Sequence, residues 1–198
     1  QQESVTLPDG SRIDINGGSV VELIENRPRF ARLTSGEAMF HIVHQDDKPF
    51  IVETTGARIM DLGTAFNVRR EDGETSVAVS EGMVVFNPDS DNVKMRAGQG
   101  LTAADDRKSR PRAKAVDIAS VGGWRDGLLV YNGVALSQVA ADLHRTTGME
   151  VSVSVDAADI SFRGALTLNA DGQRTIDDLA ALSGTRALPQ GRGWMLSR

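Results

Sequence analysis

The sequence predicts an α+β protein, with an all-β N-terminal domain and a small α+β C-terminal domain. Residues 1–118 hold short runs of alternating apolar and polar residues, bounded by Gly, Pro and Asp. After Trp124, two apolar stripes with helical spacing lie among further strands. A charged stretch and then Gly122-Gly123 separate these two patterns. We therefore expect two domains, residues 1–118 and residues 122–198.

Composition limits the possible functions. The chain has 198 residues, of which 40% are hydrophobic and 25% charged, as in ordinary globular proteins. A net charge of −5 argues against nucleic acid as a partner. No apolar run approaches the roughly 20 residues that cross a bilayer, so we expect a soluble chain without membrane contact in this part. The absence of cysteine excludes disulfides, thiolate metal sites and a cysteine nucleophile.

Two hairpins are the clearest elements of the first domain. Each contains an Asp-Gly pair, which readily takes the positive φ angles of a tight turn. The flanking strands are residues 5–7 and 13–15 for the first hairpin, and residues 66–68 and 77–79 for the second. Further strands are expected at residues 38–43, 50–52, 57–60, 93–96 and 100–103.

No helical stripe longer than one turn interrupts these strands, so a sandwich or a barrel-like sheet is expected. Residues 33–40 and 79–86 resemble each other, each with a Gly that opens a strand ending in Phe. Two copies are too few to establish a repeat, but they keep a solenoid-like arrangement open.

Residues 105–114 form a polar run with five positive and two negative charges. One interpretation is a basic patch for an anionic partner. The other is a solvated loop before the domain boundary, and this is favoured because such runs usually stay exposed.

The second domain is predicted to have the order β-α-β followed by β-α-β-β. Its first strand, residues 128–131, should end at Asn132-Gly133. Leu136, Val139, Ala140 and Leu143 then form the apolar stripe of a helix that Gly148 ends. A second helix should begin behind Thr175 as its N-cap and end at Gly184. The remaining strands are expected at residues 151–155, 161–166, 186–188 and 194–196.

The sequence offers little catalytic or cofactor chemistry. His41 and His44 lie near Asp46 and Asp47, but residues three apart on a strand point to opposite faces, so we expect no metal site. His144 is expected at the surface. No nucleophile elbow, Walker loop or dinucleotide-binding loop is present, so we expect no cofactor and no enzyme active site.

Three groups of segments together resemble the FecR family, the membrane-bound regulators of extracytoplasmic-function sigma factors. The first group is LPDGS (7–11), LTSGEAMF (33–40) and PFIV (49–52); the second is LGTAFNV (62–68), VSEGMV (79–84) and RAGQ (96–99); the third is WRDGLLVY (124–131) and LSQVAADL (136–143). Their order and spacing match the family along nearly the whole chain. The last 75 or so residues resemble the short N-terminal module of secretins and TonB-dependent receptors (the STN module).

The resemblance implies the periplasmic, signal-receiving region of a single-pass inner-membrane protein. Its partner would be the N-terminal signalling domain of an outer-membrane TonB-dependent siderophore transporter. Sigma-factor binding would belong to a cytoplasmic part that this sequence lacks. We expect the second domain to bind the transporter, with Val151, Val153, Trp194 and Leu196 as candidate partner-binding residues. Trp124 and Trp194 are of a type enriched in interfaces, although core positions are the commoner place for them.

Two alternative functions remain open. One is a carbohydrate- or cell-wall-binding module of the cell envelope. The other is self-cleavage at Gly63-Thr64, where the threonine hydroxyl would attack the preceding carbonyl in an N-to-O acyl shift. Some FecR-like regulators resemble this chain in being cut at a Gly-Thr in the corresponding motif. The competing interpretation is structural, with Gly63 forming a bulge that opens a strand.

Overall fold

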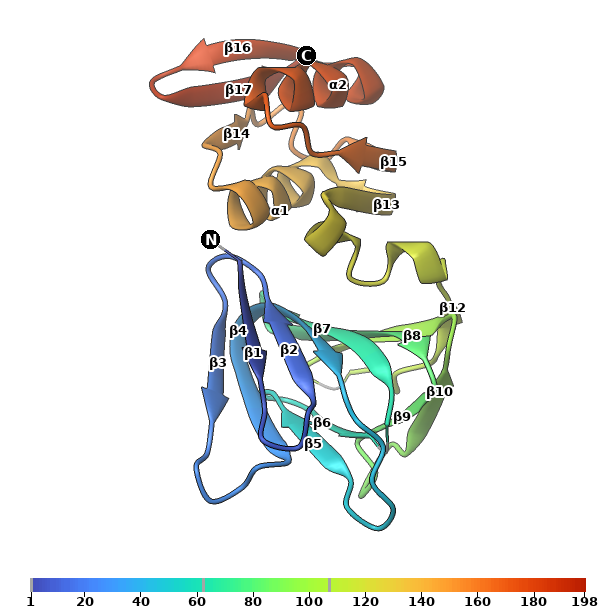
Figure 1. Ribbon diagram of the computed structural model, residues 1–198. Coiled ribbons are helices and arrows are strands. Elements are labelled where there is room, and N and C mark those ends of the chain that lie inside the picture. Colours follow the sequence, from blue (N-terminus) through green and yellow to red (C-terminus); the bar gives the residue numbers. More distant parts are fainter. Residues whose placement is uncertain (1, 62, 107) are drawn as a thin grey trace. The chain divides into compact units, whose positions relative to one another are not determined.

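The structure is a computed structural model that describes residues 2–61, 63–106 and 108–198. Leu62 of the FecR-like motif and Arg107 of the charged run lie outside the described residues. The chain divides into two compact units, Gln2–Gly122 and Gly123–Arg198, which are described separately (Figure 1).

The N-terminal unit is built on a twelve-stranded sheet. Its main path runs β10-β9-β6-β5-β4-β7-β8-β11-β12, and β2 and β3 also pair with β4, with β1 beyond β2. The strands are β1 (Glu3–Thr6), β2 (Arg12–Ile15), β3 (Val20–Leu23), β4 (Phe30–His41), β5 (Phe50–Glu53), β6 (Arg58–Asp61), β7 (Ala65–Glu71), β8 (Glu74–Glu81), β9 (Met83–Phe86), β10 (Val93–Arg96), β11 (Gln99–Ala104) and β12 (Lys114–Ala115). A short 3-10 turn, η1 (Ile118–Ser120), follows.

Strand β4 explains why the sheet curls (Figure 1). Its first half pairs with β3 and, in parallel, with β5, whereas its second half pairs with β2 and β7. The change of partners occurs around Gly36, whose φ of +88° is open to glycine. A Cβ at this position would lie 2.6 Å from the Cα of Ser19. Glycine at position 36 therefore lets β4 pair with both groups of strands.

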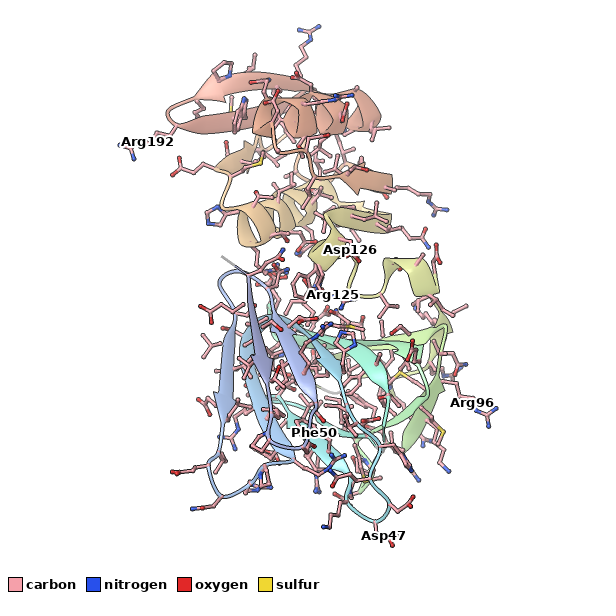
Figure 2. All side chains as sticks on the ribbon, viewed as in Figure 1. Asp47, Phe50, Arg96, Arg125, Asp126 and Arg192 are labelled. Carbon is pink, nitrogen blue, oxygen red and sulfur yellow. The ribbon has the colours of Figure 1, made fainter. Side chains whose placement is uncertain are left out.

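The core of this unit lies inside the curled sheet, between the strands that pair with the first half of β4 and those that pair with its second half. Phe40 of β4 and Phe66 of β7 stack at 5.2 Å between ring centroids, and the ring of Phe50 of β5 lies 6.3 Å from that of Phe40. All three side chains are fully buried, and Phe50 points inward (Figure 2). Except for η1, the described part of this unit is all-β, as expected.

Both predicted hairpins are present, as β1-β2 and β7-β8. The strand expected at residues 38–43 is the second half of a longer strand, β4, which begins at Phe30 and ends at His41. Strand β3 and the first half of β4 were not predicted from the sequence. Thr34-Ser35-Gly36 has the composition of a turn, and only pairing with distant strands holds it extended.

The C-terminal unit begins with a 3-10 turn, η2 (Gly123–Asp126). Its regular elements are β13 (Leu128–Ala135), α1 (Leu136–Thr147), β14 (Val151–Val153), β15 (Ser161–Thr167), α2 (Gly172–Ser183), β16 (Arg186–Gln190) and β17 (Gly193–Ser197). Strands β13 and β15 form an antiparallel ribbon, and the second sheet has the order β14-β17-β16 with β14 parallel to β17. The order of helices and strands is the predicted one.

The helices bury the apolar stripes that predicted them. Leu136, Val139 and Leu143 of α1 are fully buried, as are Ile176 and Leu179 of α2. Gly148 and Gly184 end the two helices in the left-handed conformation, as expected.

Two local expectations were wrong. Asn132-Gly133 does not end the first strand, because β13 continues to Ala135 through a bulge at that pair, with Gly133 at φ +78°. Thr175 does not cap α2. Asp171 is the N-cap, and its carboxylate accepts the N–H of Gln173 at 3.1 Å. Thr175 is instead buried within the helix and accepts the N–H of Asn169 at 2.9 Å.

Within the part of the chain that the structure describes, no helix has the length and apolar content to span a membrane.

Candidate functional site

Asp61, Gly63 and Thr64 form a compact polar cluster at the end of β6. The Thr64 hydroxyl donates a short hydrogen bond to Oδ1 of Asp61, and the Gly63 N–H donates to Oδ2 at 3.0 Å. Asp61 and Thr64 are both buried, with 1% and 7% of their surface exposed. One carboxylate therefore holds both residues of the Gly63-Thr64 pair.

Glycine is required at two positions of this cluster. Gly63 has φ +137°, and a Cβ there would lie 2.6 Å from the Cα of His44. Gly82 has φ +72°, and its Cβ would lie 2.5 Å from Cγ2 of Thr64. Contacts this short are excluded for real side chains, so the backbone packs closely around Thr64.

The cluster borders an open pocket of about 490 Å³. Arg12, His41 and Glu81 are among the residues that line it. His41 Nε2 lies 3.2 Å from Oδ2 of Asp14, and Nε of Arg12 lies 3.2 Å from Oδ1 of the same carboxylate. Water can therefore approach the Gly63-Thr64 bond from a side that carries ionisable groups.

This geometry supplies a candidate base, which could not be identified from the sequence. A carboxylate in contact with a hydroxyl is the arrangement of a general base with a nucleophile. The same contacts also fit an ordinary turn held by an aspartate side chain, as the bulge interpretation of Gly63 requires. Asp61 was not singled out from the sequence. The available signal was an Asp two residues before a Gly, because that spacing suits a turn in which the carboxylate accepts the glycine N–H.

The histidines do not assemble a metal site. His41 contacts Asp14, and His44 Nε2 lies 3.0 Å from Oδ1 of Asp46. No cluster of three metal-ligating side chains occurs within residues 2–61, 63–106 and 108–198. His144 is exposed, and its Nδ1 lies 3.1 Å from the carbonyl oxygen of Met149.

In the C-terminal unit, β14 presents one edge that pairs with no other described strand. On its other edge, Glu150 accepts the N–H of Trp194, and Ser154 donates to the carbonyl of Leu196, both at 2.9 Å. In a parallel pair, alternate residues bond to the same neighbour. The backbone groups of Val151 and Val153 therefore point away from β17, toward the open edge.

The four candidate partner-binding residues have different environments. Val151, Val153 and Trp194 are half-buried, whereas Leu196 is fully buried. The Trp194 indole N–H donates to Oε1 of Gln173 at 3.0 Å, which fixes its ring against α2. Leu196 pairs with Val153 in the sheet and is a core residue that holds β14 in place. Trp124 is also buried.

A known family matches part of the N-terminal unit, and similar crystal structures cover both units. Residues 1–85 match the family model described as FecR protein. No curated protein matches the sequence. A crystal structure of a candidate anti-sigma factor from Parabacteroides distasonis ATCC 8503, at 2.50 Å resolution, is 25% identical over 100% of this chain and 94% of its own, with a TM-score of 0.85. A second crystal structure with the same description, at 1.65 Å, has a TM-score of 0.84 and also 25% identity, over 99% of this chain and 94% of its own. These matches confirm the resemblance to the FecR family.

Proposed function

We propose that this FecR-family chain is the signal-receiving region of a sigma-factor regulator, located in the periplasm. In this proposal its C-terminal unit binds the N-terminal signalling domain of a TonB-dependent siderophore transporter. The FecR match and the anti-sigma description of the similar crystal structures support the regulatory role. The resemblance of the sequence of the last 75 or so residues to the STN module is the ground for the choice of partner.

The observation that carries the partner proposal is the open edge of β14. An extended segment of a partner can add to such an edge through main-chain hydrogen bonds. The opposite edge of the same sheet is less suited, because β16 carries Arg186 and Pro189, and charge and proline both discourage strand addition. Val151 and Val153 would supply the outward N–H and C=O groups. Trp194 would fix the neighbouring strand, and Leu196 would support it from the core.

The test removes one N–H group on the open edge of β14 and leaves the hydrogen bonds between β14 and β17 intact. Val153→Pro deletes an N–H that faces away from β17, and proline is tolerated at such an edge position. Val153→Thr is the matched control, because it keeps the N–H and the β-branched shape. Calorimetry with purified transporter signalling domains should show binding by the wild type and by Val153→Thr, and at least tenfold weaker binding by Val153→Pro. Circular dichroism of all three proteins confirms that they are folded.

Equal affinity of Val153→Pro and Val153→Thr would exclude the β14 edge as the binding surface. Absence of binding to any transporter signalling domain, combined with retention of the wild type on a peptidoglycan column, would instead favour the cell-wall-binding alternative.

Self-cleavage at Gly63-Thr64 is a second candidate function, favoured by the contact between Thr64 and Asp61. The Thr64 oxygen would attack the Gly63 carbonyl carbon while its proton passes to Asp61. The new C–O ester bond would form as the C–N bond breaks, and the proton would end on the freed Thr64 amine. Hydrolysis of the ester by water would then leave a carboxylate at Gly63 and a new N-terminus at Thr64.

Mass spectrometry distinguishes this chemistry from a structural turn. If cleavage occurs, the wild type and Thr64→Ser release a fragment that begins at residue 64, and Thr64→Ala does not. Asp61→Asn keeps an acceptor oxygen but loses the base, so its cleavage should be slower by about 100-fold or more. A single intact mass for the wild type after long incubation at neutral pH would assign the cluster to the fold alone.

A further inference from the structure

A cavity in the N-terminal unit lies over the outer side of β8 and β11, away from the Gly63-Thr64 cluster. Its volume is about 690 Å³, within the range of sites that hold small ligands or short peptide segments. Ser76 and Ala78 of β8 lie opposite Thr102 and Gly100 of β11 and form its floor. Residues 109–112 and 114–116 form its wall.

The wall presents a regular row of cations. Along residues 110–114, exposed and half-buried positions alternate, as expected for an extended chain. Ala113 packs against the hydrophobic core of the unit. Arg110, Arg112 and Lys114 are the exposed members and all line the cavity. Two residues of extended chain span about 6.6 Å, so the Cα atoms of these three residues repeat at about that interval. The Arg110 guanidinium also donates a hydrogen bond to the carbonyl oxygen of Asp91 at 2.9 Å and keeps its positive charge there.

The two carboxylates that precede this row, Asp105 and Asp106, pair with other residues and do not line the cavity. Asp105 forms two hydrogen bonds with the Arg70 guanidinium, and Asp106 forms an ion pair of 2.8 Å with Lys108. None of the described residues that line the cavity is an Asp or a Glu. The cavity is therefore locally positive in a chain whose net charge is −5.

We propose that this cavity binds an extended acidic peptide segment, with Arg110, Arg112 and Lys114 each facing a carboxylate. Alternate residues of an extended peptide also repeat at about 6.6 Å, so acidic side chains at every second position match the spacing of the row. Ser76 and Thr102, whose hydroxyls lie 2.8 Å apart, offer hydrogen-bonding groups beneath the peptide. This surface is separate from the β14 edge, and the proposal does not depend on the transporter as partner.

The experiment measures fluorescence anisotropy of labelled seven-residue peptides with the full chain at low and at physiological salt. One peptide alternates Glu with Thr, a second has the same composition with its Glu residues contiguous, and a third has Gln in place of Glu. The protein variant combines Arg110→Gln, Arg112→Gln and Lys114→Gln. The control variant combines Lys48→Gln, Lys94→Gln and Arg96→Gln, which removes the same charge from exposed positions that do not line the cavity. Arg96 projects from the ribbon into solvent (Figure 2).

The alternating peptide should bind the wild type and the control variant alike, and the cavity variant at least tenfold more weakly. Its affinity should fall as salt rises. Equal weakening by both variants would show a nonspecific response to net charge and overturn the proposal. Equal affinity for the contiguous peptide would overturn the spacing argument, and equal affinity for the Gln peptide would overturn the role of charge and with it the proposal. Tighter binding of an anionic polysaccharide would assign the cavity to another class of ligand.

Discussion

At the scale of single residues, Gly63 has two independent reasons to be glycine. Its φ of +137° is disfavoured for residues with a Cβ, and the chain at His44 leaves no space for one. Gly18 provides a comparison, because its φ is +68° but a Cβ at that position would meet nothing within 4 Å. The two glycines therefore differ both in how strongly their φ angle favours glycine and in the space that is left for a Cβ.

Gly63→Ala should therefore destabilise the protein more than Gly18→Ala. The backbone conformation should cost about 1 kcal/mol in Gly18→Ala and more in Gly63→Ala, because a φ of +137° is nearly confined to glycine. With the collision at His44, the total for Gly63→Ala should be about 3 kcal/mol. Urea unfolding of both variants measures the difference. Equal losses would mean that both the backbone at residue 63 and the chain at His44 adjust to a Cβ at little cost.

Asp9 and Arg29 form a second residue-scale feature, a largely buried ion pair of 2.5 Å. Burial alone would raise the pKa of Asp9, but hydrogen bonds from the N–H and hydroxyl of Ser11 and the nearby Arg29 guanidinium outweigh it. The pKa of Asp9 therefore lies below its ordinary value of 3.8. A carboxyl group whose pKa is lower in the folded state stabilises the protein above its unfolded pKa. That stabilisation is lost as the pH falls through the folded pKa.

Asp9→Asn should cost about 2 kcal/mol at pH 7, because a hydrogen-bonded charge pair is broken. The difference from the wild type should begin to shrink below about pH 4, where the unfolded wild-type chain takes up a proton at Asp9, and it should vanish as the pH falls through the lower folded pKa. Urea unfolding at pH 7 and pH 3 measures it, with the exposed loop variant Asp47→Asn as control (Figure 2). A difference that stays constant between the two pH values would refute the role of the Asp9 charge.

At the scale of elements, the ends of α2 are fixed by identifiable residues. Asp171 caps its first turn, and Gly184 ends it in the left-handed conformation. Asp178 lies on the exposed side of the same helix and serves as a control that carries the same charge.

Asp171→Ala should destabilise the protein by about 1 kcal/mol, because the N–H of Gln173 loses its acceptor. Asp178→Ala should change the free energy of unfolding by less than about 0.5 kcal/mol, since alanine is at least as good a helix former and the position is exposed. Thermal and urea unfolding followed at 222 nm measure both. A larger loss for Asp178→Ala than for Asp171→Ala would contradict the capping assignment.

These elements also show how far local sequence patterns reach. The hairpins and both helices could be predicted, because Asp-Gly turns and apolar stripes act within a few residues. The partner change in β4 and the parallel β4-β5 pair could not, since contacts distant in sequence determine them. The Gly63-Thr64 pair was visible as a motif. The contact of Asp61 with it depends on the bend after β6, which the sequence alone did not specify.

At the scale of the whole molecule, the two units have separate hydrophobic cores. The cluster around Phe40, Phe50 and Phe66 has no fully buried member beyond Leu101 among the described residues. In the C-terminal unit, Leu143 of α1 and Ile176 of α2 are fully buried and belong to the apolar stripes of these helices. The division at Gly122 and Gly123 lies close to the boundary expected from sequence. Independent folding of the units is a further expectation, and it bears directly on where the partner binds.

Residues 123–198 expressed alone should unfold cooperatively and bind the transporter signalling domain as tightly as the whole chain. A domain of about 75 residues buries a modest core, so its stability should be low but sufficient, and binding should raise its melting temperature. Residues 2–122 should bind at least 100-fold more weakly. Calorimetry with the three proteins, after circular dichroism has established that each is folded, makes the comparison. Equal affinity of residues 2–122 and the whole chain would move the binding surface to the N-terminal unit. A folded fragment 123–198 that binds much more weakly than the whole chain would mean that the partner contacts both units, since the β14 edge is complete within residues 123–198.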